Sequence, residues 1–204
     1  MRVGRAIGKN EEIVAIAMMA QIRDRCNPQE PPAVASDGND SYPQAMLETW
    51  GKSPDYSGRG RPPIRKQAGR DWRCLQVIKH RSGGRLIGIS YRVVHGDTKE
   101  VCDFMGLNTA YVERTNLTSR QMNGRMVRKT LSYSKEEEML KASCAWEDWI
   151  YNLTRPIKSL HVEINDRHRR WQSRSAAMAA ELTDHIWTID ELLMIVVAPE
   201  INTK

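Results

Sequence analysis

The amino-acid sequence predicts an α/β fold with a partly parallel sheet, and three observations carry this prediction. Short apolar runs alternate with segments of helical periodicity in the first third of the chain. Two β-rich runs around a pair of glycines follow, and longer helical segments fill the second half. The order strand, helix, strand, helix, hairpin and long helices is typical of layered α/β domains.

The first expected elements lie in residues 2–35. Residues 2–8 are compatible with a short strand that contains Val3 and Ile7. A helix is expected from Asn10, which can cap the first-turn N–H groups, to Arg25, before a run of prolines. Residues 33–35 are expected to form a short strand that stops at Ser36-Asp37-Gly38.

A second helix, a basic loop and a hairpin are expected next. The helix covers Asp40–Thr49 and is closed by Gly51. Residues 51–71 combine glycine and proline with many cations, which predicts an extended loop. The runs Arg73–Lys79 and Arg85–Val94, joined by Ser82-Gly83-Gly84, predict a β-hairpin.

The second half of the chain is expected to be mostly helical. A short helix at Thr98–Met105 is followed by a longer one from Thr109 to about Val127. Capping boxes are expected at Ser134–Glu137 and Thr188–Glu191, and a helix at Ser175–Leu182. An apolar stripe is expected to pack into the core, and it comprises Met139, Trp146, Ile150 and Leu153. The six tryptophans are also expected mainly in the core, with Trp72 the most exposed.

Length and composition bound the class of protein. A chain of 204 residues, 40% apolar, can bury a substantial core. We expect one main domain at 1–160 and a tail at 161–204 that packs on it. The longest apolar segment is far shorter than the roughly 20 residues of a membrane helix, and the early apolar run lacks a signal-peptide cleavage site. A cytoplasmic location is therefore expected.

The charge distribution favours a polyanionic partner. The net charge is +6 and the isoelectric point is near 9.2, which favours nucleic acid through counterion release. The cations gather in three segments, within residues 59–73, 114–129 and 167–174. The four cysteines are widely separated, which excludes the paired spacing of a zinc site.

Two acids are candidates for metal-dependent chemistry. Asp37 follows a strand, at the position where open α/β sheets build their sites. Glu113 lies on an expected helix and can approach Asp37 from the side. Paired carboxylates hold Mg²⁺, and two such ions can activate and stabilise the oxygens of phosphoryl transfer. From the residues alone the signal is weak, and a turn aspartate and an exposed helix acid are the simpler interpretations.

Four segments of the sequence resemble insertion-sequence-one-type transposases of the DDE class. Val112 to Arg120 reads V-E-R-x-N-L-T-x-R and Arg128 to Lys135 reads R-K-T-L-S-x-S-K. Upstream, ASDGNDSYPQAM is similar to the segment with the second family aspartate, and RWQSRSAAMAAELTDHIWTIDELL to the C-terminal segment. The resemblance covers nearly the whole chain. It implies a ribonuclease-H-like (integrase-type) core with a basic loop and hairpin insertion and a helical tail.

The resemblance also implies an activity and site residues. Such transposases use Mg²⁺ or Mn²⁺ to cut element ends and join them to target DNA, commonly as oligomers. The second aspartate of the triad matches Asp37 and the glutamate matches Glu113. The first aspartate is not matched, so we expect a core truncated at the N-terminus and an inactive chain. Asp97 and Asp103 follow Asp37 in chain order and are poor substitutes.

Several cations are candidate DNA ligands. Arg114 and Arg120 follow Glu113 on the expected helix, and a guanidinium group can bind phosphate through two parallel hydrogen bonds. In the basic loop, Arg61, Arg65 and Lys66 can follow a DNA backbone. A solvated or structural role remains open for each, and Asn116 can either support the site or face water. The alternative function is a non-catalytic DNA-binding fragment that competes with an intact transposase.

Overall fold

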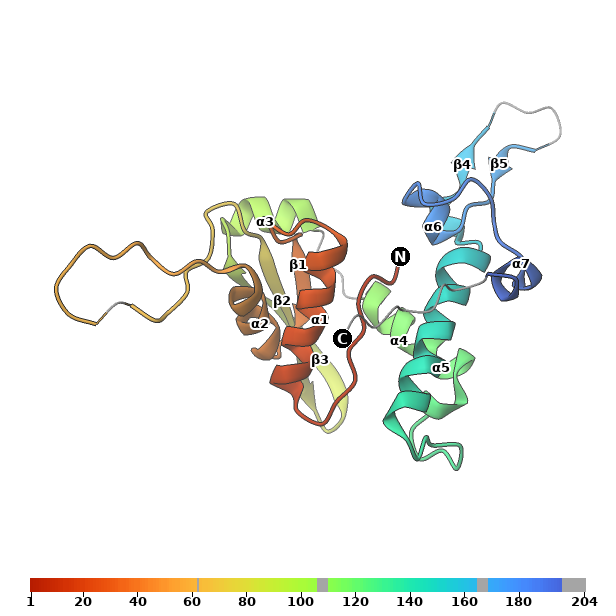
Figure 1. The fold of residues 1–204 in the computed structure, drawn as a ribbon, viewed down its shortest axis with the longest axis horizontal. Helices are drawn as coiled ribbons and strands as arrows, with labels where there is room; N and C mark the ends of the chain where they lie inside the picture. The colour runs from red at the N-terminus through yellow and green to blue at the C-terminus, as the bar shows by residue number, and fades with distance from the viewer. Residues whose placement is uncertain (62, 106–109, 165–168, 196–204) are drawn as a thin grey trace, which may run out of the picture. The chain divides into compact units, whose positions relative to one another are not determined.

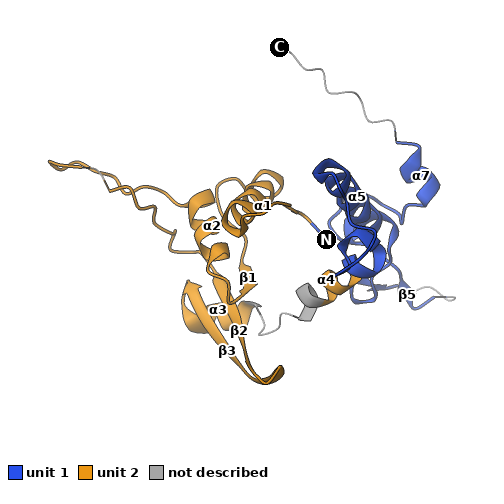
Figure 2. Ribbon diagram, turned by 90° about the horizontal axis from the view of Figure 1, so that it is seen from below, with its two compact units in different colours: residues 1–2, 119–204 blue, residues 3–118 orange. Residues whose placement is uncertain are grey.

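The chain divides into two compact units. The structure is a computed structural model that describes residues 1–61, 63–105, 110–164 and 169–195, without the side chains of residues 105 and 110–113. In chain order, we call Val3–Thr118 the first unit (orange, labelled unit 2 in Figure 2). We call Met1–Arg2 with Ser119–Lys204 the second unit (blue, labelled unit 1 in Figure 2). The boundary expected after residue 160 falls within the second unit, so that functional division stays a prediction.

A small mixed sheet forms the centre of the unit at Val3–Thr118. In the described residues its order is β1 (Val34–Asp37), β2 (Cys74–Ser82) and β3 (Arg85–His95). β1 runs parallel to β2, and β2 runs antiparallel to β3 (Figure 1). The predicted α/β class with a partly parallel sheet is confirmed.

Two helices precede and follow β1, at α1 (Glu11–Arg25) and α2 (Ser41–Trp50). The Asn10 side chain accepts hydrogen bonds from the first-turn N–H groups of Glu12 and Ile13, at 2.9 and 3.2 Å. At the end of α2, the Gly51 N–H donates to the Leu47 carbonyl at 2.8 Å. Both predicted helix boundaries are thereby confirmed to within one residue.

The sheet has a packed layer on each face. On one face, α1 and α2 bring Met19, Met46 and Trp50 against Cys74. On the other, Leu75 and Val77 pack against Val101 of α3 (Thr98–Met105). Met19, Met46 and Leu75 are at most 2% exposed, and burying each side chain contributes about 1.5–3 kcal/mol. The alternation of Cys74 and Leu75 between the two layers follows the two-residue period of a strand.

The hairpin turn was predicted correctly. Ser82 pairs with Arg85, so the loop consists of Gly83 and Gly84. Their φ angles are +56° and +80°, the left-handed values that two-residue hairpin turns require and that glycine adopts without a Cβ penalty.

Two expectations in this unit were wrong. Residues 2–8 form no strand, because side chains occupy their backbone groups. The Arg5 N–H donates to the Gln21 amide oxygen at 3.1 Å, and the Gln21 amide nitrogen donates to the Arg5 carbonyl at 2.9 Å. Trp72 is 7% exposed despite its charged neighbours, because it meets the His95 ring edge-on at 5.6 Å.

Helix α4 (Ala110–Met122) crosses the division between the units, and short elements follow it. The principal helix of the second unit, α5 (Glu137–Trp149), continues as a π-helical turn at Ile150–Thr154. The remaining elements are the 3₁₀ turns Gly124–Met126 and Lys158–Leu160, the antiparallel pair β4 (Val162–Glu163) and β5 (Trp171–Gln172), α6 (Ala176–Ala179) and α7 (Ile189–Leu193).

The second unit corrects two further expectations and confirms a third. The helix expected to reach Val127 ends at Met122, because the Asn123 side chain accepts from the Arg125 N–H at 3.1 Å and starts a separate turn. Ser134 does not cap α5; its hydroxyl accepts from Arg125 instead, and Glu136 is the N-cap. The box at Thr188–Glu191 is present as expected.

The apolar stripe of α5 is not a core stripe. Met139 is 51% exposed and Trp146 is 40% exposed. The buried residues of this helix are Cys144 and Glu147. Trp149 and Trp171 are also exposed, against the expectation for the tryptophans.

The bend after β3 gives a test of the fold. Gly96 has a φ of +99°, and a Cβ built there would lie 2.6 Å from the Trp72 carbonyl oxygen and 2.8 Å from Val101. Gly96→Ala is expected to cost on the order of 1–3 kcal/mol of unfolding free energy. Gly88→Ala is the matched control, since its Cβ would meet only His80, at 4.0 Å. Urea unfolding compares the two, and equal stabilities would contradict the assigned backbone.

Candidate functional site

Asp37 lies at the carboxyl end of β1, where the sequence placed it. It is the last residue of the strand and pairs with Val77 in the parallel register. Its side chain is exposed, and one carboxylate oxygen accepts the Asn39 N–H at 3.2 Å. This local turn directs the chain from β1 into α2, so the carboxylate sits at the edge where sheets of this class bind ligands.

Asn39 links Asp37 to a second carboxylate. Its amide nitrogen donates to Glu11 in the first turn of α1, at 3.1 Å. Its amide oxygen accepts the Ser41 N–H at 2.9 Å. We call Glu11, Asp37, Asn39 and Tyr42 the strand-end cluster. The sequence suggested only a helix-dipole role for Glu11, because nothing in the spacing indicates that α1 begins beside Asp37.

The pKa of Tyr42 depends on the negative charge of the strand-end cluster. Burial raises the pKa of its phenol above the ordinary value of 10.0, and the negative charges of Asp37 and Glu11 raise it further. Both carboxylates therefore act on the same hydroxyl group. A cation brought to this cluster would be attracted by both acids.

The buried side-chain amide of Gln76 is hydrogen-bonded to the strand-end cluster. Gln76 is fully buried; its nitrogen donates to the Asn39 carbonyl at 2.9 Å, and its oxygen accepts from Arg92 Nε at 2.7 Å. Arg92 also forms an ion pair with Asp40. That pair is exposed and contributes at most about 1 kcal/mol, whereas an orphaned buried amide costs about 1–3 kcal/mol. Gln76 is thus the residue that fixes Arg92 and Asn39.

Glu113 and its neighbours lie on α4, as expected from the sequence. The side chain of Glu113 falls outside the described residues, so its approach to Asp37 stays a prediction. Arg114, Asn116 and Arg120 are exposed. Asp97 directly precedes α3, and its carboxylate accepts the N–H groups of Lys99 and Glu100 in the first turn at 2.9 and 3.1 Å. That capping role accounts for Asp97 without a catalytic function.

The strand-end cluster contains two carboxylates, which is too few for a site with two Mg²⁺ ions. Asp37 and Glu11 offer carboxylate oxygens, which magnesium prefers while it keeps several waters. Across the described part of the chain, no group of three or more His, Cys, Asp or Glu is arranged to hold a metal ion. A two-ion site would need ligands beyond this cluster.

The basic loop extends between α2 and β2 (Figure 1). Its candidate cations divide into one that is held by an ion pair and two that are exposed. Lys52 and Gln67 pair through their backbones and close its base, at 3.2 and 2.9 Å. The Lys66 ammonium lies 2.9 Å from the Glu48 carboxylate, so its charge is partly offset. Arg61 and Arg65 are exposed. These two arginines are the stronger phosphate candidates of the three.

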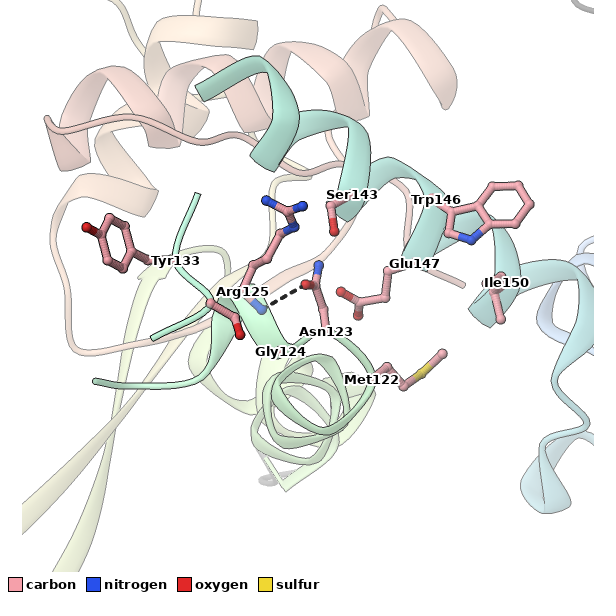
Figure 3. A pocket seen from close by; sticks show the side chains of 10 residues that line it. Met122, Asn123, Gly124, Arg125, Tyr133, Ser143, Trp146, Glu147 and Ile150 are labelled. Carbon is pink, nitrogen blue, oxygen red and sulfur yellow. Dashed lines mark hydrogen bonds between the residues drawn. The ribbon is translucent and has the colours of Figure 1, made fainter. Parts of the chain in front are cut away.

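A cavity of about 630 Å³ lies in the second unit, between the end of α4, the loop after it and α5 (Figure 3). Arg125, Trp146 and Glu147 line it. Glu147 is 4% exposed and forms an ion pair with Arg2. Of the predicted site residues whose side chains are described, none lines this cavity.

Two other side chains of types that often take part in catalysis, His185 and Cys74, have structural roles here. The His185 ring is hydrogen-bonded to two carboxylates. Its Nδ1 lies 2.6 Å from Asp184, and its Nε2 lies 3.2 Å from Glu191 of the α7 capping box. Burial raises the pKa of the Cys74 thiol to about 11, which makes it a poor nucleophile. The four cysteines are free thiols, as expected, although Cys26 is exposed.

Comparisons with protein-family models, curated proteins and solved structures give no match. Among the described residues, no helix is long and apolar enough to cross a membrane.

The Tyr42 phenol gives a test of the cluster. Asp37→Asn and Glu11→Gln should each lower its pKa toward the ordinary value, because each removes a negative charge that disfavours the phenolate. Asp24→Asn, about 20 Å from Glu11 along α1, is the matched control. The pKa is measured by NMR titration of ¹³C-labelled tyrosine. An unchanged Tyr42 pKa in both cluster variants would show that the two acids do not meet there.

Proposed function

We propose that this chain is part of a DDE transposase of the insertion-sequence-one type, with a ribonuclease-H-like core. The observation that carries the proposal is the strand-end position of Asp37, together with the motif V-E-R-x-N-L-T-x-R on α4. A mixed sheet with helices on both faces is the architecture that such a core requires. The partner is DNA, and the cofactor is Mg²⁺ or Mn²⁺.

The residues have distinct roles in this proposal. Asp37 and Glu113 are the metal-binding acids that the sequence motifs match. Asn39 and Gln76 position Asp37 through the turn after β1. Arg114 and Arg120 bind phosphate beside Glu113, and Arg61 and Arg65 contact the DNA backbone. The bound metal would activate the attacking oxygen and stabilise the leaving oxygen in strand cleavage and joining.

The chain is expected to be inactive as a catalyst by itself. The two-metal mechanism uses an acid shared between the ions, and the sequence matches only two acids of the triad. Glu11 offers a third carboxylate near Asp37, but it lies on a helix and not on a strand. This count of acids also favours the alternative function, a DNA-binding protein that competes with an intact transposase.

A strand-transfer assay tests the proposal. The purified chain is incubated with Mg²⁺ or Mn²⁺ and a supercoiled plasmid that carries its own gene with the flanking genomic sequence. We expect the chain to bind the plasmid but neither to cleave nor to join DNA strands. Added to an active transposase of the same type, the chain is expected to lower joining by competing for DNA.

Two results would contradict this account. Metal-dependent joining that Asp37→Ala or Glu113→Ala abolishes, while Asp24→Ala leaves it intact, would show that this sequence does contain a third ligand. If the chain binds no plasmid at low salt, DNA is not its partner. Both the transposase function and the alternative of a competing DNA-binding protein would then be excluded.

A further inference from the structure

The β2–β3 hairpin extends well past the rest of its sheet. β1 pairs only with Cys74–Val77, so in the described residues 78–82 and 85–90 pair only with each other. Figure 2 shows the hairpin continuing beyond β1. Five residues of strand span about 16 Å. The free part of the hairpin is therefore a two-stranded ribbon that is longer than a DNA major groove is deep, about 8.5 Å.

The ribbon carries cations and no acids. The sequence from Trp72 to Gly96 contains no Asp or Glu. Arg92, near its base, is paired with Asp40. Arg81 and Arg85 flank the turn, are exposed, and form no ion pair within the described part of the chain. The positive charge of the ribbon is thus concentrated at its tip.

The shape of the tip allows close approach to another molecule. Gly83 and Gly84 form the turn, and Cβ atoms built on them would meet nothing within 4 Å. Two paired strands are about 5 Å apart, and a B-form major groove, about 12 Å wide, admits a two-stranded ribbon with its side chains. Leu86 and Ile87, which are 51% and 69% exposed, stand next to the tip and can contact thymine methyl groups.

We infer that the β2–β3 hairpin is a DNA-binding ribbon whose tip enters the major groove, with Arg81 and Arg85 on the phosphates that line the groove. This inference rests on the proposed function only in taking duplex DNA as the partner. It assigns a contact surface that is separate from the basic loop and from α4. A tip lined with arginine and free of acids also disfavours edge-to-edge pairing with a second copy of the chain.

Duplex binding by the full chain tests the hairpin. Arg81→Ala/Arg85→Ala should reduce the slope of log K against log salt by about two, since each lost phosphate contact removes about 0.9. Affinity at 0.1 M salt should fall on the order of tens of fold. Lys9→Ala/Lys99→Ala removes the same charge from exposed helix ends and should change the slope little. Arg81→Lys/Arg85→Lys should retain the slope, and circular dichroism confirms folding of each variant.

Groove occupancy is measured by competition. The major-groove ligand methyl green should displace the wild-type chain, whereas the minor-groove ligand netropsin should not. Wild-type binding with an unchanged slope in Arg81→Ala/Arg85→Ala would overturn the inference and leave the proposed function standing. Displacement by netropsin alone would overturn the groove assignment. Absence of wild-type binding would overturn both the inference and the proposed function.

Discussion

The parallel pairing of β1 with β2, from Val34 opposite Cys74 to Asp37 opposite Val77, determines where the chain turns at Gly38. Gln76 lies within this pairing and is fully buried, so its amide must find partners. It finds them in the Asn39 carbonyl and Arg92. Asn39 in turn bonds to Asp37 and Glu11. One buried amide thus connects the sheet to the acids at its edge.

Local signals predicted most of the first unit. Asn10, Gly51 and the pair Gly83-Gly84 act through hydrogen bonds or φ angles within a few residues, so their roles can be recognised in the sequence. Misses occurred where distant groups decided the outcome. Residues 2–8 resemble a strand, but Gln21 occupies the Arg5 backbone. Trp72 has charged neighbours in sequence, but His95 covers it in space.

The candidate site was predictable in part for the same reason. Asp37 follows a strand in the sequence, so its position at the sheet edge follows from topology. Glu11 is 26 residues away, and only the packing of α1 brings it to Asn39. The basic loop was recognised by composition, yet composition does not distinguish Lys66, held by Glu48, from Arg61 and Arg65. The hairpin tip was not predicted as a site, because only the pairing of Arg81 with Leu86 and of Ser82 with Arg85 places both arginines beside the turn.

The proposed function requires that Asp37 and Glu113 share one metal site. A titration of the ¹⁵N-labelled chain with Mn²⁺ tests it most directly, because the ion broadens amide signals within a limited radius. We expect early broadening at Gly38 and Asn39 and, at the same Mn²⁺ concentration, at the amides around Glu113. Asp37→Asn should abolish both effects. Broadening near Asp37 that leaves the Glu113 amides sharp would contradict the shared site, as would broadening that persists in Asp37→Asn.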